Sequence, residues 1–134
     1  MKIMVMDGQG GGVGKSLIEA LLNRLPEAEV IAVGTNATAT SNMMKGGTAY
    51  GATGENAVIY NSNRVDVIIG PLGIVMANAM LGEITPKMAE AVTSGNAKLI
   101  LIPMNKYHVT MVGVENKKLG DYIKEAVDKV EEML

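Results

Sequence analysis

The residues with the clearest chemical potential form one glycine-rich segment, DGQGGGVGKS, at positions 7–16. A short apolar run, Ile3 to Met6, precedes it, and an apolar stripe at four-residue spacing follows it as far as Pro26. A strand, a glycine-rich turn and a helix in this order present free backbone N–H groups and a helix N-terminus to a phosphate. The segment therefore predicts binding of a nucleotide or another phosphorylated small molecule.

Other segments are expected to meet this loop at one edge of a sheet, because ligands of open parallel sheets bind outside the carboxyl ends of the strands. We expect backbone amides near Val13 to hold the phosphate, and two polar residues after the second strand to meet the ribose. A lysine in the first helical turn is unfavourable unless a bound anion reverses that effect. The candidate ligand-binding residues are Gly8, Gln9, Gly10, Gly12, Val13, Gly14, Lys15, Ser16, Thr35, Asn36, Gly70, Pro71, Gly73 and Asn105.

Two familiar phosphate-binding motifs fit the loop incompletely. A P-loop ends in Gly-Lys-Ser/Thr, which residues 14–16 supply, but Gln9 stands where its first glycine belongs. No later predicted strand ends in an acid that would hold Mg²⁺, so phosphoryl transfer is disfavoured and a P-loop-like NTPase is kept only as an alternative. The strict dinucleotide fingerprint fails as well, and residues 34–36, where an acid would grip the ribose, are Gly-Thr-Asn.

A looser glycine spacing does match a known pattern. Gly8, Gly12 and Gly14 follow glycine-x-x-x-glycine-x-glycine, and the loop resembles that of the short-chain dehydrogenases, with Asp7 in place of their usual Thr. The Tyr-x-x-x-Lys pair that those enzymes use for proton transfer is missing, so the resemblance covers only the first strand, turn and helix. We predict a nucleotide- or dinucleotide-binding protein with NAD or NADP as the leading cofactor and no assigned reaction. The alternatives are another nucleotide, or no ligand at all, with the glycines serving only tight packing of strand against helix.

Catalytic candidates are few. His108 is the single histidine and could carry a proton near neutral pH. Glu55 and Glu83 stand in glycine-flanked loops, where each could act as an acid or base, or could simply cap a neighbouring helix. Nothing in the sequence has metal-ligand spacing, and no Ser/His/Asp set can be assigned, so we predict no metal site.

Short apolar runs and helical patterns alternate along the chain. Continuous runs predict strands that are covered on both faces, at 3–6, 30–33, 65–69 and 99–102, with a weaker run at Val109 to Val112. Helical patterns cover 13–25, 37–45, 55–61, 85–94 and 119–130, whereas residues 51–54 are expected to form a loop. This alternation predicts a three-layer α/β fold with a Rossmann-like, doubly wound, mostly parallel sheet of about four or five strands.

Composition is typical of one globular domain spanning residues 1–134. The chain is 48% hydrophobic without Phe or Trp, so its core must be aliphatic, and its 11 Met residues suit irregular gaps. A net charge of −2 and the lack of a basic run argue against nucleic-acid binding. Neither a signal-peptide core nor an apolar span of about 18 residues occurs, so we expect a cytoplasmic protein that does not enter a membrane.

The segment at 72–81, LGIVMANAML, is unusually apolar for a connection between elements. It predicts either a buried helix or the lining of a ligand pocket or subunit contact, because large apolar patches on proteins usually have partners. A non-catalytic sensor or assembly module that forms a homodimer through this segment is therefore the alternative function.

Longer stretches carry a wider resemblance: DGQGGGVGKS, VGTNATATS, YGATGENA, IIGPLGIVMANAMLGEITPKMAEAV and LILIPMNK. Through them, nearly the whole chain is similar to a family of short, single-domain bacterial Rossmann-like proteins of unassigned function. This resemblance implies a stand-alone Rossmann-like domain and brings no substrate, cofactor or catalytic residue with it.

Overall fold

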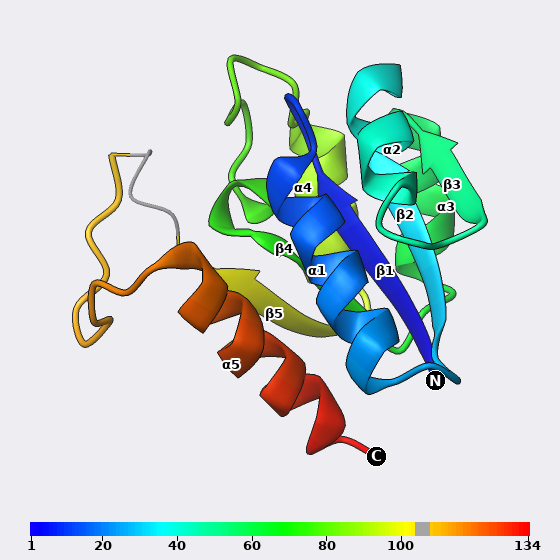
Figure 1. The fold of residues 1–134 in the computed structure, drawn as a ribbon. Helices are drawn as coiled ribbons and strands as arrows, with labels where there is room; N and C mark the ends of the chain where they lie inside the picture. Colours follow the sequence, from blue (N-terminus) through cyan, green and yellow to red (C-terminus); the bar gives the residue numbers. More distant parts are fainter. Residues whose placement is uncertain (104–107) are drawn as a thin grey trace.

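A computed structural model describes residues 1–103 and 108–134, and across them five parallel strands form a sheet in the order β3-β2-β1-β4-β5 (Figure 1). The chain moves outward from β1 to β3 and then crosses back to β4, so the topological switch point lies between β1 and β4. Sheets of this kind bind ligands in the crevice at that point. The strands are β1 (Lys2–Asp7), β2 (Glu29–Gly34), β3 (Tyr50–Thr53), β4 (Val67–Pro71) and β5 (Lys98–Ile102).

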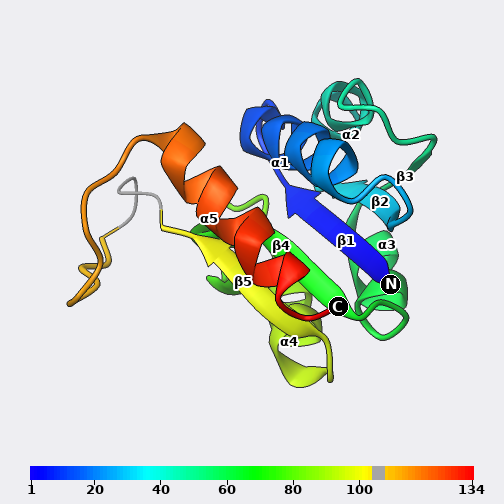
Figure 2. The same cartoon turned by 60° about the horizontal axis from the view of Figure 1, so that its bottom comes forward.

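Helices cover both faces of the sheet and make three layers (Figure 2). One face carries α1 (Gly12–Arg24), α2 (Ala37–Met44) and α5 (Leu119–Glu131), and the other carries α3 (Glu55–Ser62) and α4 (Pro86–Ser94). A short 3-10 helix, η1 (Leu72–Val75), follows β4. The predicted fold, a doubly wound α/β Rossmann-like domain, is therefore confirmed.

The core is aliphatic and lies in two layers, as alternation along β1 requires. Val5 points to the face of α1 and α5, where it belongs to a cluster with Leu17 and Val127. Met4 points to the opposite face, where it belongs to a cluster with Met88. Met4 and Val5, which point to opposite faces of β1, are both fully buried, and this explains why the strand is a continuous apolar run.

Two predictions for individual segments are wrong: the loop expected at residues 51–54 and the weak strand expected at residues 109–112. The edge strand β3 covers residues that the sequence indicated as loop, since its four residues, Tyr50 to Thr53, have exposed or half-buried side chains and no apolar pattern. It pairs with β2, and a Cβ on Gly51 would lie 2.4 Å from the sulfur of Met44, so glycine there lets α2 approach. Residues 109–112 form no strand, and they are exposed because no helix covers them.

The apolar segment at 72–81 is not one helix. Its first four residues form η1, and the rest is a series of turns. Ile74 and Met80 are buried in the same cluster as Met88 of α4, and Leu72 is buried as well, whereas Leu81 is 98% exposed. The apolar character of this segment is therefore used mainly inside the molecule.

Gly70 provides a test of the close packing between β1 and β4. A Cβ on Gly70 would lie 2.2 Å from the carbonyl oxygen of Met6, a backbone atom that cannot move aside. We expect Gly70→Ala to lower the free energy of unfolding by about 2 kcal/mol, as overpacking does. Gly120→Ala is the matched control, because a Cβ there meets nothing within 4 Å. Urea denaturation of both variants measures the difference, and equal stability would contradict this account.

Candidate functional site

The carboxylate of Asp7 holds the glycine loop that joins β1 to α1. Asp7 ends β1 and is only 5% exposed. Its Oδ1 accepts the N–H of Gly8 and its Oδ2 accepts the N–H of Gly14, each at 2.8 Å. The N-cap residue of α1 is Gly11, which has no capping side chain, so Asp7 supplies the acceptor from the preceding strand. One side chain therefore fixes both ends of the loop.

A second carboxylate, that of Glu83, reaches the same loop from the segment between η1 and α4. Its Oε1 accepts the N–H of Gln9 at 2.8 Å. The same oxygen accepts the hydroxyl of Thr35 at 2.7 Å and the side-chain amide of Asn36 at 2.9 Å. Glu83 therefore joins three segments that are far apart in the sequence, at the carboxyl ends of β1 and β2.

Further hydrogen bonds tie the loop to the start of α2. Asn36 is the N-cap of α2, where its Oδ1 accepts the N–H of Ala39 at 2.8 Å. Its amide also donates to the carbonyl of Gln9 at 3.0 Å, and the amide of Asn42 donates to the carbonyl of Gly10 at 2.8 Å. The predicted ribose-binding residue Asn36 thus uses its side chain to hold the loop and Glu83.

The backbone that delivers Glu83 is unusual. Asn78, Met80 and Leu81 have φ angles of 68°, 58° and 58°, in the left-handed region that non-glycine residues rarely adopt, and Gly82 follows at 91°. The Asn78 N–H donates to the carbonyl of Ile84 at 2.6 Å and closes the turn. Backbone in this region is costly and persists only where surrounding packing enforces it. The burial of Met80 and Ile84 provides that packing.

Hydrogen bonding keeps the Glu83 carboxylate ionised. The hydroxyl of Thr35 lowers the pKa of Glu83 below its ordinary value of 4.5. Partial burial raises this pKa, but the N–H of Gln9 and the amide of Asn36 lower it again, and the net direction is downward. Glu83 therefore carries its negative charge at neutral pH.

The five glycines of the loop fall into two groups. A Cβ on Gly8 would lie 2.6 Å from the sulfur of Met80, and one on Gly11 would lie 2.6 Å from a backbone oxygen of α2. A Cβ on Gly14 would lie 2.8 Å from the side chain of Met43. In contrast, a Cβ on Gly10 or Gly12 would meet no atom of the described residues within 4 Å, and neither glycine has a left-handed φ. Internal packing explains the first three glycines and leaves the last two unexplained.

The same part of the loop presents unused donors. Within residues 1–103 and 108–134, the N–H groups of Gly10, Gly12 and Val13 have no protein acceptor, and we call these three residues the loop mouth. A hollow of about 480 Å³ adjoins the loop mouth at Gly10. The outer face of α2 forms its other wall, which is lined by Ala37, Thr38, Ser41, Asn42 and Lys45.

Other candidate residues lie around this site or apart from it. The Nζ of Lys15 is 3.9 Å from Glu19, one turn further along α1, and Ser16 is half-buried beside it. The carboxyl end of β4 and the start of η1 carry Gly70, Pro71 and Gly73, which are buried, whereas Asn105 lies outside the described residues. Glu55 begins α3, and His108 is exposed on the segment after β5. In the described chain neither makes a hydrogen bond with the loop.

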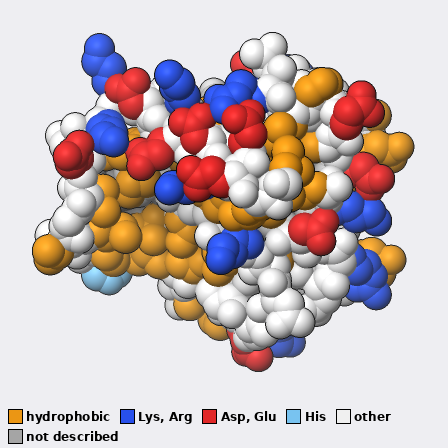
Figure 3. Space-filling view, turned by 90° about the horizontal axis from the view of Figure 1, so that it is seen from below, with side chains coloured by type: hydrophobic (Ala, Val, Ile, Leu, Met, Phe, Trp, Pro, Cys, Tyr) orange, Lys and Arg blue, Asp and Glu red, His pale blue; other side chains and the backbone are white. Residues whose placement is uncertain are grey.

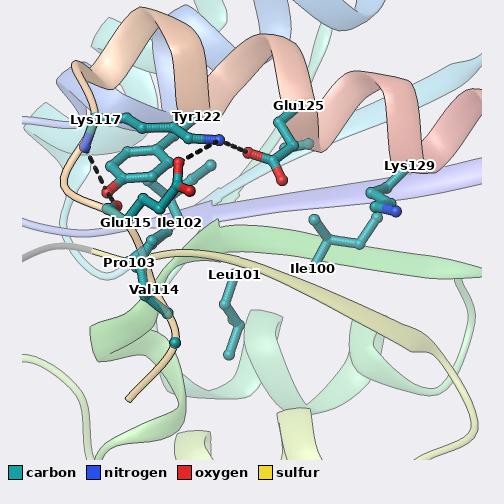
Figure 4. Close-up of a pocket in the computed structure, with 12 residues that line it drawn as sticks. Ile100, Leu101, Ile102, Pro103, Val114, Glu115, Lys117, Tyr122, Glu125 and Lys129 are labelled. Carbon is teal, nitrogen blue, oxygen red and sulfur yellow. Dashed lines mark hydrogen bonds and ion pairs between the residues drawn. The ribbon is translucent and has the colours of Figure 1, made fainter. Parts of the chain in front are cut away.

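A second hollow, of about 440 Å³, lies between the edge strand β5 and α5 (Figure 4). Tyr122 accepts the N–H of Lys117 at 2.9 Å and donates to the carbonyl of Glu115, while the Nζ of Lys117 is 3.2 Å from Glu125. Val114, which lines this hollow, is 41% exposed. Figure 3 shows apolar side chains gathered on one face of the molecule. Because β4 separates β5 from β1, this hollow is distinct from the glycine-loop site.

The described residues, 1–103 and 108–134, hold neither a metal-binding cluster nor a membrane-spanning helix. No group of three His, Cys, Asp or Glu side chains there is arranged to hold a metal ion. Among the helices of the same residues, none combines the length and apolar character needed to cross a membrane.

Comparison with known proteins identifies a family and supports the fold. The family described as "Domain of unknown function (DUF3842)" matches residues 2–134. The chain belongs to this family. None of the curated proteins matches its sequence.

Among solved structures, the chain is similar to a dodecameric FMN-dependent Ubix-like decarboxylase from Escherichia coli O157:H7. The TM-score is 0.54 and the sequence identity is 20%, over 99% of this chain and 94% of the other. A likeness at this identity shows the fold, which is Rossmann-like in both proteins.

The sequence did not predict that the carboxylates of Asp7 and Glu83 hold the glycine loop. Asp7 is notable there only as a departure from a motif, and Glu83 only as a catalytic candidate or helix cap. No spacing rule predicts the contact between Glu83 and Gln9, because 74 residues separate them. The one local signal is the position of Glu83 in the short stretch between the apolar segment at 72–81 and the start of α4 at Pro86. This position keeps Glu83 near the end of the sheet.

The lowered pKa of Glu83 predicts a pH-dependent contribution to stability. A carboxylate whose pKa falls on folding stabilises the protein above its unfolded-state pKa, and this contribution is lost as pH falls through the folded-state value. We expect Glu83→Gln to lower the free energy of unfolding by about 1–2 kcal/mol at neutral pH, with a difference that shrinks below the ordinary value of 4.5. Denaturation of both proteins across this range measures it.

Glu90→Gln on the exposed side of α4 is the matched control for this experiment, because it removes the same charge without touching the loop. A difference between wild type and Glu83→Gln that stays constant down to low pH would contradict the role given to the ionised carboxylate.

Proposed function

We propose that this protein binds a nucleotide through its phosphate at the loop mouth. The observation that carries this proposal is the pair of glycines, Gly10 and Gly12, that internal packing does not require. Glycine in these positions costs conformational entropy, and a close approach of ligand to backbone is a general reason for keeping it. The free N–H groups of Gly12 and Val13, at the start of α1, are the donors that a phosphate at a helix N-terminus uses.

Internal hydrogen bonds limit where the phosphate sits. Asp7 and Glu83 already accept the N–H groups of Gly8, Gln9 and Gly14, so those donors are not available to a ligand. A phosphate is therefore confined to the loop mouth, close to the first turn of α1.

The ionised carboxylate of Glu83 also favours one class of phosphate. A terminal phosphate monoester carries about 1.5 to 2 negative charges at neutral pH. Each phosphate of a dinucleotide has one ester and one anhydride link and carries one charge, so the repulsion between Glu83 and the phosphate nearest to it is smaller. The pyrophosphate of NAD or NADP is therefore preferred over the monoester of FMN, the cofactor named for the structural neighbour.

The hollow beside the loop mouth has room for the rest of such a ligand. Its volume of about 480 Å³ lies within the usual range of small-molecule sites. Thr38 and Ser41 offer hydroxyl groups there, and Lys45 offers a positive charge.

The two alternatives have less support from the structure. An assembly module acting through residues 72–81 requires an apolar surface, yet Leu72, Ile74 and Met80 are buried, and Leu81 alone is an exposed large apolar residue within this segment. A P-loop-like NTPase requires a lysine at the phosphate, whereas Lys15 is paired with Glu19 along α1. Assembly into a homo-oligomer stays a prediction.

Alanine at the loop mouth separates ligand binding from folding. We expect Gly10→Ala and Gly12→Ala to leave the free energy of unfolding unchanged or raise it by up to about 1 kcal/mol, because nothing opposes the added Cβ. The same variants are expected to weaken NAD binding about tenfold or more, measured by isothermal titration calorimetry.

Gly120→Ala, in the first turn of α5, is the control and should leave binding unchanged. The proposal fails if the wild type binds none of NAD, NADP, FMN or FAD. It also fails if Gly12→Ala binds NAD as tightly as the wild type does.

A further inference from the structure

Dinucleotide sites in this fold grip the adenosine ribose with an acidic side chain at the carboxyl end of the second strand. Residues 34–36 provide no acid at that place. The structure brings one there from elsewhere, since Oε1 of Glu83 lies 2.7 Å from the Thr35 hydroxyl and 2.9 Å from the Asn36 amide. A carboxylate therefore stands at the end of β2 although the local sequence has none.

This carboxylate is held firmly and still has capacity to bind. Its Oε1 accepts three hydrogen bonds, from the backbone of Gln9 and the side chains of Thr35 and Asn36. Its Oε2 accepts none from the part of the chain that the structure describes. An ionised carboxylate accepts hydrogen bonds with both oxygens, so Oε2 is available to a ligand hydroxyl.

The turn before Glu83 agrees with a role beyond packing. Three non-glycine residues with left-handed backbone, Asn78, Met80 and Leu81, stand within the five positions before it. Such costly conformations gather at ligand-binding sites, where they place a side chain that a relaxed turn would not place.

We propose that Glu83 accepts the ribose 2′-hydroxyl of the bound nucleotide and thereby selects NAD over NADP. This inference rests on the proposed nucleotide-binding function and names the ligand class of the same site. In NADP a phosphate replaces the hydrogen of that hydroxyl, which removes the donor and adds negative charge beside a carboxylate. Thr35 and Asn36 act as positioning residues, because they hold Glu83 and bind no ribose themselves.

No arginine of the chain stands ready to hold a 2′-phosphate. Arg24 pairs with Asp128 and Glu131 at the far end of α1, and Arg64 lies over the ring of Tyr60. Lys45 is the cation that lines the hollow beside the loop mouth, but it is the C-cap of α2, at the opposite end of that helix from Asn36, which binds Glu83.

Titration of NAD and NADP into wild type, Glu83→Gln and Glu90→Gln tests the proposal. We expect the wild type to bind NAD about thirtyfold or more tightly than NADP, since the phosphate forfeits a hydrogen bond and meets a like charge. In Glu83→Gln the amide removes the repulsion, so the ratio should fall to about threefold or less. Glu90→Gln removes a charge of the same sign elsewhere and should keep the wild-type ratio.

Glu83→Asp separates charge from reach and also serves if the glutamine variant does not fold. Its shorter side chain should weaken NAD binding while the retained charge keeps NADP excluded. A merely structural Glu83 would change the affinities for both dinucleotides equally and leave their ratio unaltered in every variant.

The outcomes distinguish this inference from the function on which it rests. If no nucleotide binds, both are overturned. If NAD binds at the loop mouth and Glu83→Gln keeps the wild-type ratio, only the role of Glu83 is overturned. A wild type that prefers NADP also overturns it.

Discussion

The carboxylate of Asp7 is the constraint on which the arrangement of the site depends. It is almost fully buried at the end of β1 and accepts one N–H from each end of the glycine loop. A buried carboxylate must be paired with donors, and the N–H groups of Gly8 and Gly14 are two of the donors to Asp7. Because both ends of the loop are held by one group, the residues between them have little freedom. The loop mouth therefore keeps its donors facing outward.

Glu83 adds a second constraint of the same chemical kind. It connects the loop to the start of α2 and to the segment before α4, which are all at the carboxyl edge of the sheet. The contact places a negative charge beside a site that is proposed to bind an anion. That conflict is informative, because it confines a phosphate to the loop mouth and leaves a hydroxyl group as the natural partner of Glu83.

The glycines of the loop show how two demands share one short segment. Gly8, Gly11 and Gly14 are required by close contacts with Met80, α2 and Met43. Gly10 and Gly12 are required by no contact within the described chain, and their own N–H groups are two of the three donors of the loop mouth. A glycine-rich loop is therefore poor proof of a ligand until each glycine has been assigned to packing or to an open surface.

Local sequence was enough to determine most elements and the fold class. Continuous apolar runs predicted β1, β2, β4 and β5, and a Thr-Pro start with a Gly-Asn stop predicted α4, because these signals depend on neighbours within about one turn or strand. The edge strand β3 escaped this reasoning, since an exposed strand of four residues carries no periodic apolar pattern. Only pairing with β2 defines it.

The sequence by itself thus determined that a glycine loop opens the first helix of a Rossmann-like domain. Only the tertiary structure decided which loop donors remain open and which carboxylate stands at the end of β2. The physical reason is that Gln9 and Glu83 form a hydrogen bond because the fold brings them close in space. They are 74 positions apart in the sequence, so no local pattern indicates this contact.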